Sequence, residues 1–121
     1  MNNILLVFLG GGFGSIVRYG ISELVKSNFK SAFPLATLIS NVLSCIILAL
    51  TITYFSEKLG TNSSLKTLII IGFCGGFSTF STFSYETIEL MRSGNLLIAI
   101  TNIIVSVAVC ISLIYILTKQ S

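Results

Sequence analysis

The sequence predicts an all-α membrane protein whose chain crosses the bilayer four times. Of its 121 residues, 54% are hydrophobic and only 9% are charged, whereas an ordinary soluble domain carries about 25% charged residues. The apolar residues also form runs of about 20, the length that a helix needs to span a bilayer. These runs predict a single membrane domain over residues 1–121, with spans at about 4–25, 33–55, 65–91 and 96–117.

The composition excludes several classes of protein. Seven basic and four acidic residues give a net charge of +3, which is too small and too scattered to suggest nucleic-acid binding. The sequence has no histidine and no recognisable nucleophile–base pair, so an enzyme is not expected. The three cysteines fall in hydrophobic segments at spacings that fit no metal site. We interpret Cys45, Cys74 and Cys110 as small buried residues.

The first predicted span contains small residues spaced four apart. Gly10 and Gly14 form one such pair, and Gly11 and Ser15 form another. This pattern lets two helices approach closely in a membrane. Arg18 follows in the same span and has two interpretations: its side chain reaches the nearer interface, or its charge draws anions into a vestibule.

The second span begins after Pro34, and proline is tolerated at the start of a helix. Thr37, Asn41 and Ser44 follow at spacings of four and three, so they share one helix face. Asn41 lies near the middle of the bilayer and has two interpretations. Its amide either forms an interhelical hydrogen bond or donates its hydrogens to a dehydrated anion.

The third span holds the most unusual stretch of the chain, GFCGGFSTFSTFSYE at residues 72–86. A glycine pair, Gly75–Gly76, precedes a dense run of hydroxyl side chains. These hydroxyl residues are Ser78, Thr79, Ser81, Thr82 and Ser84. Unwound backbone at membrane depth is tolerated only where protein or a water-filled cavity satisfies its polar groups. We therefore predict that the third helix breaks near its middle, where the glycine pair is followed by hydroxyl residues, as in the discontinuous helices of transporters.

Such a break creates two polar helix ends. Free carbonyl groups at the end of the first half suit a cation, and free N–H groups at the start of the second half favour an anion. The hydroxyl side chains have a second interpretation, because serine and threonine also form hydrogen bonds between membrane helices. Their density favours a lined path.

The phenylalanines of this span, Phe73, Phe77, Phe80 and Phe83, share a face if the helix is continuous. The spacing is typical of ordinary packing. The edges of aromatic rings are electropositive, however, so rings that line a channel would attract an anion. Glu86 follows shortly after Phe83 and is either an interfacial residue or an extension of this run.

The fourth span carries Asn102, Ser106 and Cys110 at spacings of four. Residues four apart lie one above the other on a helix. The stripe therefore faces something polar, either a packing partner or a lined path.

The basic residues near the span ends do not favour one orientation, although the Lys/Arg bias of short loops normally sets it. An even number of spans places both termini on one side of the membrane. The basic residues on that side are Lys58, Lys66 and Lys119, and those on the other side are Lys26, Lys30 and Arg92, with Arg18 as a possible fourth. We expect insertion in both orientations. Because four short helices enclose a pore poorly, we predict an antiparallel, dual-topology homodimer, which reproduces the inverted repeats of transporters.

Three motifs of the chain together resemble the fluoride channels of the Fluc (CrcB) family. They are GGGFGSIVRYG in the first span, Pro34–Thr37 with Asn41 in the second, and GFCGGFSTFSTF in the third, which is the most specific. The resemblance covers the whole chain. It implies an antiparallel homodimer in the bacterial cytoplasmic (inner) membrane that exports fluoride passively and selectively through two pores.

The resemblance also implies roles for individual residues. Phe80, Phe83 and Asn41 would line the pore, with Thr37, Ser81, Thr82 and Ser106 as a polar stripe along it. Arg18 and Glu86 would lie in the vestibules. The backbone carbonyls of Gly75 and Ser78 from both subunits would hold a central Na⁺ ion at the dimer interface. Three positions depart from the family pattern: Ser78 where many members have threonine, Ala36 in place of a common glycine, and Asn102 where some members have tyrosine.

Two other functions are compatible with four short spans. A small dual-topology transporter of the multidrug-resistance type needs a membrane-embedded carboxylate in the first span, where this chain has Arg18. A structural subunit without transport activity would use the hydroxyl run only for helix contacts.

Overall fold

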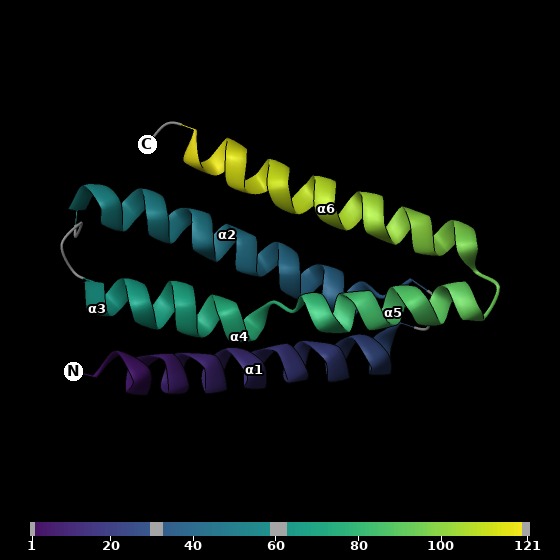
Figure 1. The fold of residues 1–121 in the computed structure, drawn as a ribbon, viewed down its shortest axis with the longest axis horizontal. Helices are drawn as coiled ribbons and strands as arrows, with labels where there is room; N and C mark the ends of the chain where they lie inside the picture. Colours follow the sequence, from purple (N-terminus) through teal and green to yellow (C-terminus); the bar gives the residue numbers. More distant parts are fainter. Residues whose placement is uncertain (1, 30–32, 59–62, 120–121) are drawn as a thin grey trace.

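The computed structural model describes residues 2–29, 33–58 and 63–119, and the described chain is helical (Figure 1). The helices are α1 (Asn3–Asn28), α2 (Leu35–Lys58), α3 (Ser63–Lys66), η1 (Thr67–Cys74), α4 (Gly75–Phe77), α5 (Phe80–Arg92) and α6 (Leu96–Thr118). The π-helical turns of η1 join α3 to α4, and these elements together with α5 form the third span. Four stretches are long and apolar enough to cross a membrane, which confirms the prediction of four potential spans.

The spans alternate in direction, and the N- and C-terminal ends of the chain lie at the same end of the bundle (Figure 1). The first span packs against η1 and α4, α2 packs against α6, and α5 packs against α6. Of the predicted basic residues, Lys30 lies outside the described residues, as does the side chain of Lys58.

The small residues of α1 let the first and third spans approach closely, as their spacing predicts. Gly10 and Gly14 are buried. A methyl group added at Gly14 would overlap with the carbonyl oxygen of Phe73 and lie 2.8 Å from the backbone nitrogen of Phe77. On the other side of the contact, a methyl group at Gly76 would overlap with the carbonyl oxygen of Gly11. Backbone therefore packs directly on backbone here.

Replacing Gly14 with alanine is expected to lower the free energy of unfolding by about 1–3 kcal/mol, because the added methyl group must push two backbones apart. The measurement is the melting temperature in detergent, followed by the loss of the monodisperse peak in size-exclusion chromatography. Gly12→Ala is the matched control, because nothing lies within 4 Å of a methyl group at Gly12. Equal melting temperatures for the two variants would contradict the close contact.

The third span is interrupted near its middle, two residues after the glycine pair. Gly75 has helical backbone angles (φ −64°, ψ −35°), and α4 continues to Phe77. The extended residues are Ser78 (φ −91°, ψ 155°) and Thr79 (φ −152°, ψ 123°). The interruption is compatible with the predicted break near the middle of the third helix, and it falls at the hydroxyl residues rather than at the glycine pair. The glycine pair lies in the helix that packs on α1, and the break falls where hydroxyl side chains can cap both helix ends.

Hydroxyl groups of Ser78 and Thr79 stabilise the two ends of the interruption. The Ser78 hydroxyl donates to the carbonyl oxygen of Cys74 at 2.8 Å. The Thr79 hydroxyl oxygen accepts the backbone N–H of Thr82 at 3.2 Å, which makes Thr79 the N-cap of α5. Threonine is among the residues that favour this position because its side-chain oxygen satisfies an otherwise free N–H group.

The break also divides the phenylalanine stripe. Phe73 and Phe77 form one ring pair with centroids 5.4 Å apart, and Phe80 and Phe83 form another with centroids 5.7 Å apart. Phe77 is 2% exposed, whereas Phe80 is 77% exposed. The four rings would share one face only in a continuous helix, and the extended residues Ser78 and Thr79 separate them into two pairs.

Candidate functional site

A cavity of about 310 Å³ opens beside the break in the third span. Residues of α2, of the break, of α5 and of α6 form its wall. The residues that line it are Asn41, Cys45, Ser78, Thr79, Phe80, Phe83, Ser106, Val107, Cys110 and Ile111. Four residues that the sequence assigned to the anion path therefore lie around one space: Asn41, Phe80, Phe83 and Ser106.

The Asn41 side chain is oriented by the break itself. Its oxygen, Oδ1, accepts the backbone N–H of Thr79 at 3.1 Å. An amide that accepts through its oxygen keeps both hydrogens of its nitrogen for other partners. Among the residues that the structure describes, none accepts a hydrogen bond from this nitrogen. The wall of the cavity thus carries an uncharged amide donor whose orientation is fixed.

The aromatic part of the wall comes from the first turn of α5. The rings of Phe80 and Phe83 are inclined by 40° to each other. Phe83 is 8% exposed and anchored in the bundle, whereas Phe80 stands out from the single chain. Because aromatic edges carry partial positive charge, this pair adds electropositive surface beside the Asn41 amide without adding a formal charge.

The carbonyl groups on the other side of the break have distinct partners. The Gly76 carbonyl oxygen accepts from Arg18 Nε at 3.2 Å and from the Ser15 hydroxyl at 3.5 Å. Arg18 therefore contacts the end of the first half of the third span, where a cation is favourable because carbonyl groups accumulate partial negative charge. The sequence suggested that the Arg18 side chain reaches the nearer interface or draws anions into a vestibule. Neither interpretation includes this contact with Gly76.

The Gly75 carbonyl group is affected differently by the break. In a continuous helix it would accept the N–H of Thr79, but that N–H is directed to Asn41 instead. Gly75 is exposed in the single chain, and nothing lies within 4 Å of a methyl group built on it. A carbonyl oxygen released from its helical bond fits the requirement of a cation for oxygen ligands.

A chain of buried polar side chains joins α5 to α6 behind the cavity. The Thr87 hydroxyl donates to the Phe83 carbonyl oxygen at 2.8 Å, the Asn102 nitrogen donates to the Thr87 oxygen at 3.1 Å, and the Ser106 hydroxyl donates to the Asn102 oxygen at 3.2 Å. Thr87, Asn102 and Ser106 are all buried, and Asn102 is 1% exposed. Asn102 is thus a link between two helices rather than a residue of the cavity wall.

The direction of these bonds determines what Ser106 can offer to the cavity. Thr87 uses its only hydrogen on the Phe83 carbonyl, so Asn102 must donate to Thr87 and accept from Ser106. The Ser106 hydrogen is therefore occupied, and the serine presents an oxygen lone pair to the cavity. An anion needs donors, so Ser106 would first have to break its bond to Asn102 before it could bind one directly.

Thr87 was not among the site residues predicted from the sequence. A signal was present, because α5 and α6 are joined by a short turn with Gly94 in a left-handed conformation (φ 90°). Residues at equal distances from such a turn face each other. Thr87 precedes Gly94 by seven positions and Asn102 follows it by eight, so the two polar residues are paired across the hairpin.

Replacing Asn102 with alanine is expected to lower the free energy of unfolding by about 1–3 kcal/mol, because it leaves buried groups of Thr87 and Ser106 without their partner. The neighbouring variant Thr101→Ala is the matched control, since Thr101 is exposed and bonds only to the Leu97 carbonyl of its own helix. Melting in detergent compares the two. If the melting temperature fell no more in Asn102→Ala than in Thr101→Ala, the result would contradict the role of Asn102 as a link between α5 and α6.

A second cavity, of about 430 Å³, lies between the start of α2 and the far end of α5. It is lined by Phe33, Pro34, Glu86, Glu89, Leu90, Ser93 and Asn95. Glu86 belongs to this cavity, where its carboxylate interacts with Thr37. One of its oxygens, Oε1, is buried, and no described residue forms a hydrogen bond with it.

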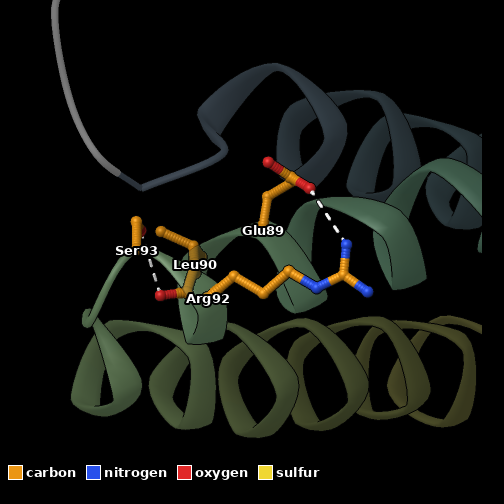
Figure 2. Close-up of polar contacts among 4 residues, drawn as sticks. All are labelled: Glu89, Leu90, Arg92 and Ser93. Carbon is orange, nitrogen blue, oxygen red and sulfur yellow. Dashed lines mark hydrogen bonds and ion pairs between the residues drawn. The ribbon is translucent and has the colours of Figure 1, made fainter.

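The rim of the second cavity is partly neutralised. Glu89 Oε1 lies 3.9 Å from an Arg92 guanidinium nitrogen, and both side chains are largely exposed (Figure 2). The Ser93 hydroxyl donates to the Leu90 carbonyl oxygen at 3.1 Å and closes the last turn of α5 (Figure 2). An exposed pair of this kind contributes little to stability, but it offsets the negative charge beside Glu86.

The other predicted site residues are distributed around the two cavities. Ser81 and Thr82 lie in the first turn of α5 and interact with the Thr79 hydroxyl at 3.2 and 3.3 Å, outside both cavity linings. Thr37 is buried one helical turn before Asn41 on α2. Ser78 lines the first cavity, whereas Gly75 faces away from the packed bundle.

The four long apolar helical stretches define a multi-pass membrane protein. Residues 5–117 match the family described as "CrcB-like protein, Camphor Resistance (CrcB)", and the chain belongs to this family.

Several curated relatives carry the name "Fluoride-specific ion channel FluC". The relative from Coxiella burnetii (strain CbuK_Q154) is 40% identical over 111 residues, which cover 91% of this chain and 90% of the relative. The relative from Shewanella halifaxensis is 40% identical over 95% of this chain and 92% of its own length. The relative from Chloroflexus aurantiacus (strain ATCC 29366 / DSM 635 / J-10-fl) is 41% identical over 88% of this chain and 85% of its own.

Proposed function

We propose that this chain is a passive, selective fluoride channel that lowers cytoplasmic fluoride by letting it leave across the bacterial cytoplasmic membrane. The names of the relatives support the substrate. The observation that carries the proposal is the amide of Asn41, whose oxygen is bound by the Thr79 N–H so that its hydrogens remain available in the first cavity. The relatives are named as ion channels, which also supports the expectation that the chain is not an enzyme.

The proposed path follows α2 from the second cavity to the first. Pro34 lines the second cavity, Thr37 interacts with Glu86, and Asn41 lines the first cavity. Because α5 runs in the opposite direction to α2 (Figure 1), its residues follow the reverse order: Glu86 lies at the second cavity, and Phe83 and Phe80 lie at the first. An anion on this path would meet a hydroxyl group, then an amide and then aromatic edges.

The donors along this path are suited to a small, strongly hydrated anion. Fluoride loses its water only if many donors replace it, and the Asn41 amide and the ring edges of Phe80 and Phe83 provide donors without a full positive charge. Conduction requires binding that is favourable enough for entry and weak enough for exit. A lysine in the path would bind the ion too tightly, and none of the described residues that line the two cavities is a lysine.

We also propose that two chains pair antiparallel, with one pore on each side of the dimer axis. The even distribution of basic residues predicts insertion in both orientations. Gly75 and Phe80 are exposed in the single chain, which suits a face that a second chain completes. A terminal tag modified by a membrane-impermeant reagent should react from both sides of the membrane. Modification from one side alone would contradict dual topology.

The Gly75 and Ser78 carbonyl oxygens of both chains are proposed to hold a sodium ion on the dimer axis. The released Gly75 carbonyl and the open space around it support this assignment. A bound cation would neutralise the carbonyl ends of the two broken helices and connect the chains. Gly75 leaves room for close approach, and Ser78 holds its own backbone extended through the bond of its hydroxyl to Cys74.

A multidrug-type exchanger is the alternative, and its chemistry requires a carboxylate at membrane depth in the first span. The carboxylate of α1 is Glu23, which is exposed and lies in the last turns of the helix. Arg18, closer to the middle, binds the Gly76 carbonyl. This arrangement favours an anion channel over a transporter of cations.

Passive conduction is tested by asking whether fluoride release requires a pathway for a counter-ion. Liposomes that contain the purified protein and fluoride are diluted into fluoride-free buffer, and a potassium ionophore is then added. A passive channel releases fluoride rapidly only after the ionophore relieves the membrane potential. Release that instead follows an imposed proton gradient without the ionophore would identify an exchanger.

A further inference from the structure

We propose that Cys45 and Cys110 form a two-thiol site for a soft metal ion in the wall of the first cavity, and that an ion bound there blocks the path. Both cysteines are free, half-buried and part of the cavity lining. The Cys110 side chain lies next to the Cys45 thiol and interacts with it. Both thiols therefore lie at the same cavity, where α2 packs against α6.

The positions of the cysteines on their helices explain why they meet. Cys45 lies four residues after Asn41 on α2, and Cys110 lies four residues after Ser106 on α6. The two helices run in the same direction and pack side by side (Figure 1). One helical turn on each therefore leads from the Asn41–Ser106 level of the cavity to a level formed by the two thiols.

The side chains of Cys45 and Cys110 determine which class of metal ion can bind in this part of the cavity. Thiolate sulfur is a soft ligand that favours soft metals. Zinc in structural sites needs four ligands, and no group of three or more Cys, His, Asp or Glu residues able to hold a metal occurs within the described part of the chain. Two thiolates are sufficient for ions that accept linear, two-coordinate binding, such as Hg²⁺. The remaining neighbours, Val107 and Ile111, are apolar and supply no competing ligand.

Binding is a ligand exchange without a redox step. The two S–H bonds break, two metal–sulfur bonds form and two protons leave through the cavity, while the oxidation states of metal and sulfur stay unchanged. The bound ion ties α2 to α6 and occupies the space beside Asn41. The expected consequence is a block of anion movement, and this part of the inference rests on the proposed function.

The first experiment measures binding alone. The purified full-length protein, free of reductant, is titrated with mercuric nitrate, and the ultraviolet absorption of mercury–thiolate bonds is followed in competition with glutathione. Cys45→Ala and Cys110→Ala are each expected to weaken binding by about 100-fold or more, because two linked ligands bind far more tightly than one. Cys74→Ala is the matched control, since its buried thiol donates to the Ser44 carbonyl and lies outside the lining of the first cavity. Wild-type affinity in Cys45→Ala or Cys110→Ala would overturn the site.

The second experiment measures block in liposomes, with each protein compared with its own flux before metal is added. Mercuric ion should stop fluoride release by the wild type and by Cys74→Ala, dithiothreitol should restore it, and the Cys45 and Cys110 variants should stay unblocked. Tight two-thiol binding with unchanged flux would refute the block. Tight binding in a protein that never conducts fluoride would refute the proposed function and leave the metal site intact. Serine variants replace the alanine variants if the latter do not fold.

Discussion

Replacing Asn41 with aspartate is expected to abolish fluoride conduction while the protein still folds. Aspartate keeps an oxygen that can accept the Thr79 N–H, which Asn41 Oδ1 accepts at 3.1 Å, so the break in the third span is retained. The substitution removes both amide hydrogens and adds a negative charge in the cavity. Loss of one hydrogen bond to a charged group costs about 1.5–3 kcal/mol, and repulsion between like charges adds to it. We expect fluoride flux to fall by at least about 100-fold, equivalent to about 2.7 kcal/mol.

The same substitution at an exposed position provides the control. Asn28 lies at the end of α1, is exposed and bonds to the Leu24 carbonyl, so Asn28→Asp makes the same chemical change away from both cavities. Flux from liposomes is measured for both variants after size-exclusion chromatography shows that they are folded. If Asn41→Asp released fluoride as fast as Asn28→Asp, the result would show that Asn41 is not part of the conduction path.

Replacing Phe80 with isoleucine is expected to give the second large loss of conduction. Isoleucine is apolar but lacks the electropositive ring edge, so hydrophobic contact is retained while the proposed interaction with the anion is removed. We expect flux to fall by about 100-fold or more, while size-exclusion chromatography shows that the variant is still folded, because isoleucine keeps an apolar side chain at this position.

Phe13→Ile is the matched control for this prediction. Phe13 is a ring of similar exposure, 69%, on α1, and it lies outside both cavity linings. The variant should conduct like the wild type. Equal flux from Phe80→Ile and Phe13→Ile would show that the aromatic edge of Phe80 has no part in conduction.

The sequence predicted the spans well because the bilayer imposes a strict rule. Backbone groups at membrane depth must be paired within the segment, so apolar runs of sufficient length become helices. The glycine spacing of α1 likewise predicted the close contact, because Gly14 and Gly76 are useful where backbone meets backbone. Both inferences depend on local sequence and on a general property of the membrane.

The position of the break could not be predicted from glycine content. Two local rules competed: glycine weakens a helix, but small residues are also needed where helices touch. Contact with Gly11 keeps Gly76 helical, and the hydroxyl groups of Ser78 and Thr79 cap the two ends instead. Tertiary contact determined the outcome, and it was not visible in the sequence of the third span alone.

The contacts of Arg18 and Asn102 were missed for a similar reason. Arg18 donates to the Gly76 carbonyl from a different span, and Asn102 bonds to Thr87 across the α5–α6 hairpin. The polar stripe of the fourth span identified Ser106 as a residue at the cavity. It could not reveal that the Ser106 hydrogen is held by Asn102, because hydrogen-bond direction depends on the whole chain of partners.

Parallel efflux of fluoride and chloride tests the central claim most directly. Liposomes that hold the purified wild-type protein and both anions are diluted into buffer without either anion, a potassium ionophore balances the charge, and an electrode for each ion follows its release. The proposed channel predicts rapid loss of fluoride with chloride retained. Release of both anions at similar rates, or of neither from a well-folded protein, would contradict a fluoride-selective path past Asn41 and Phe80.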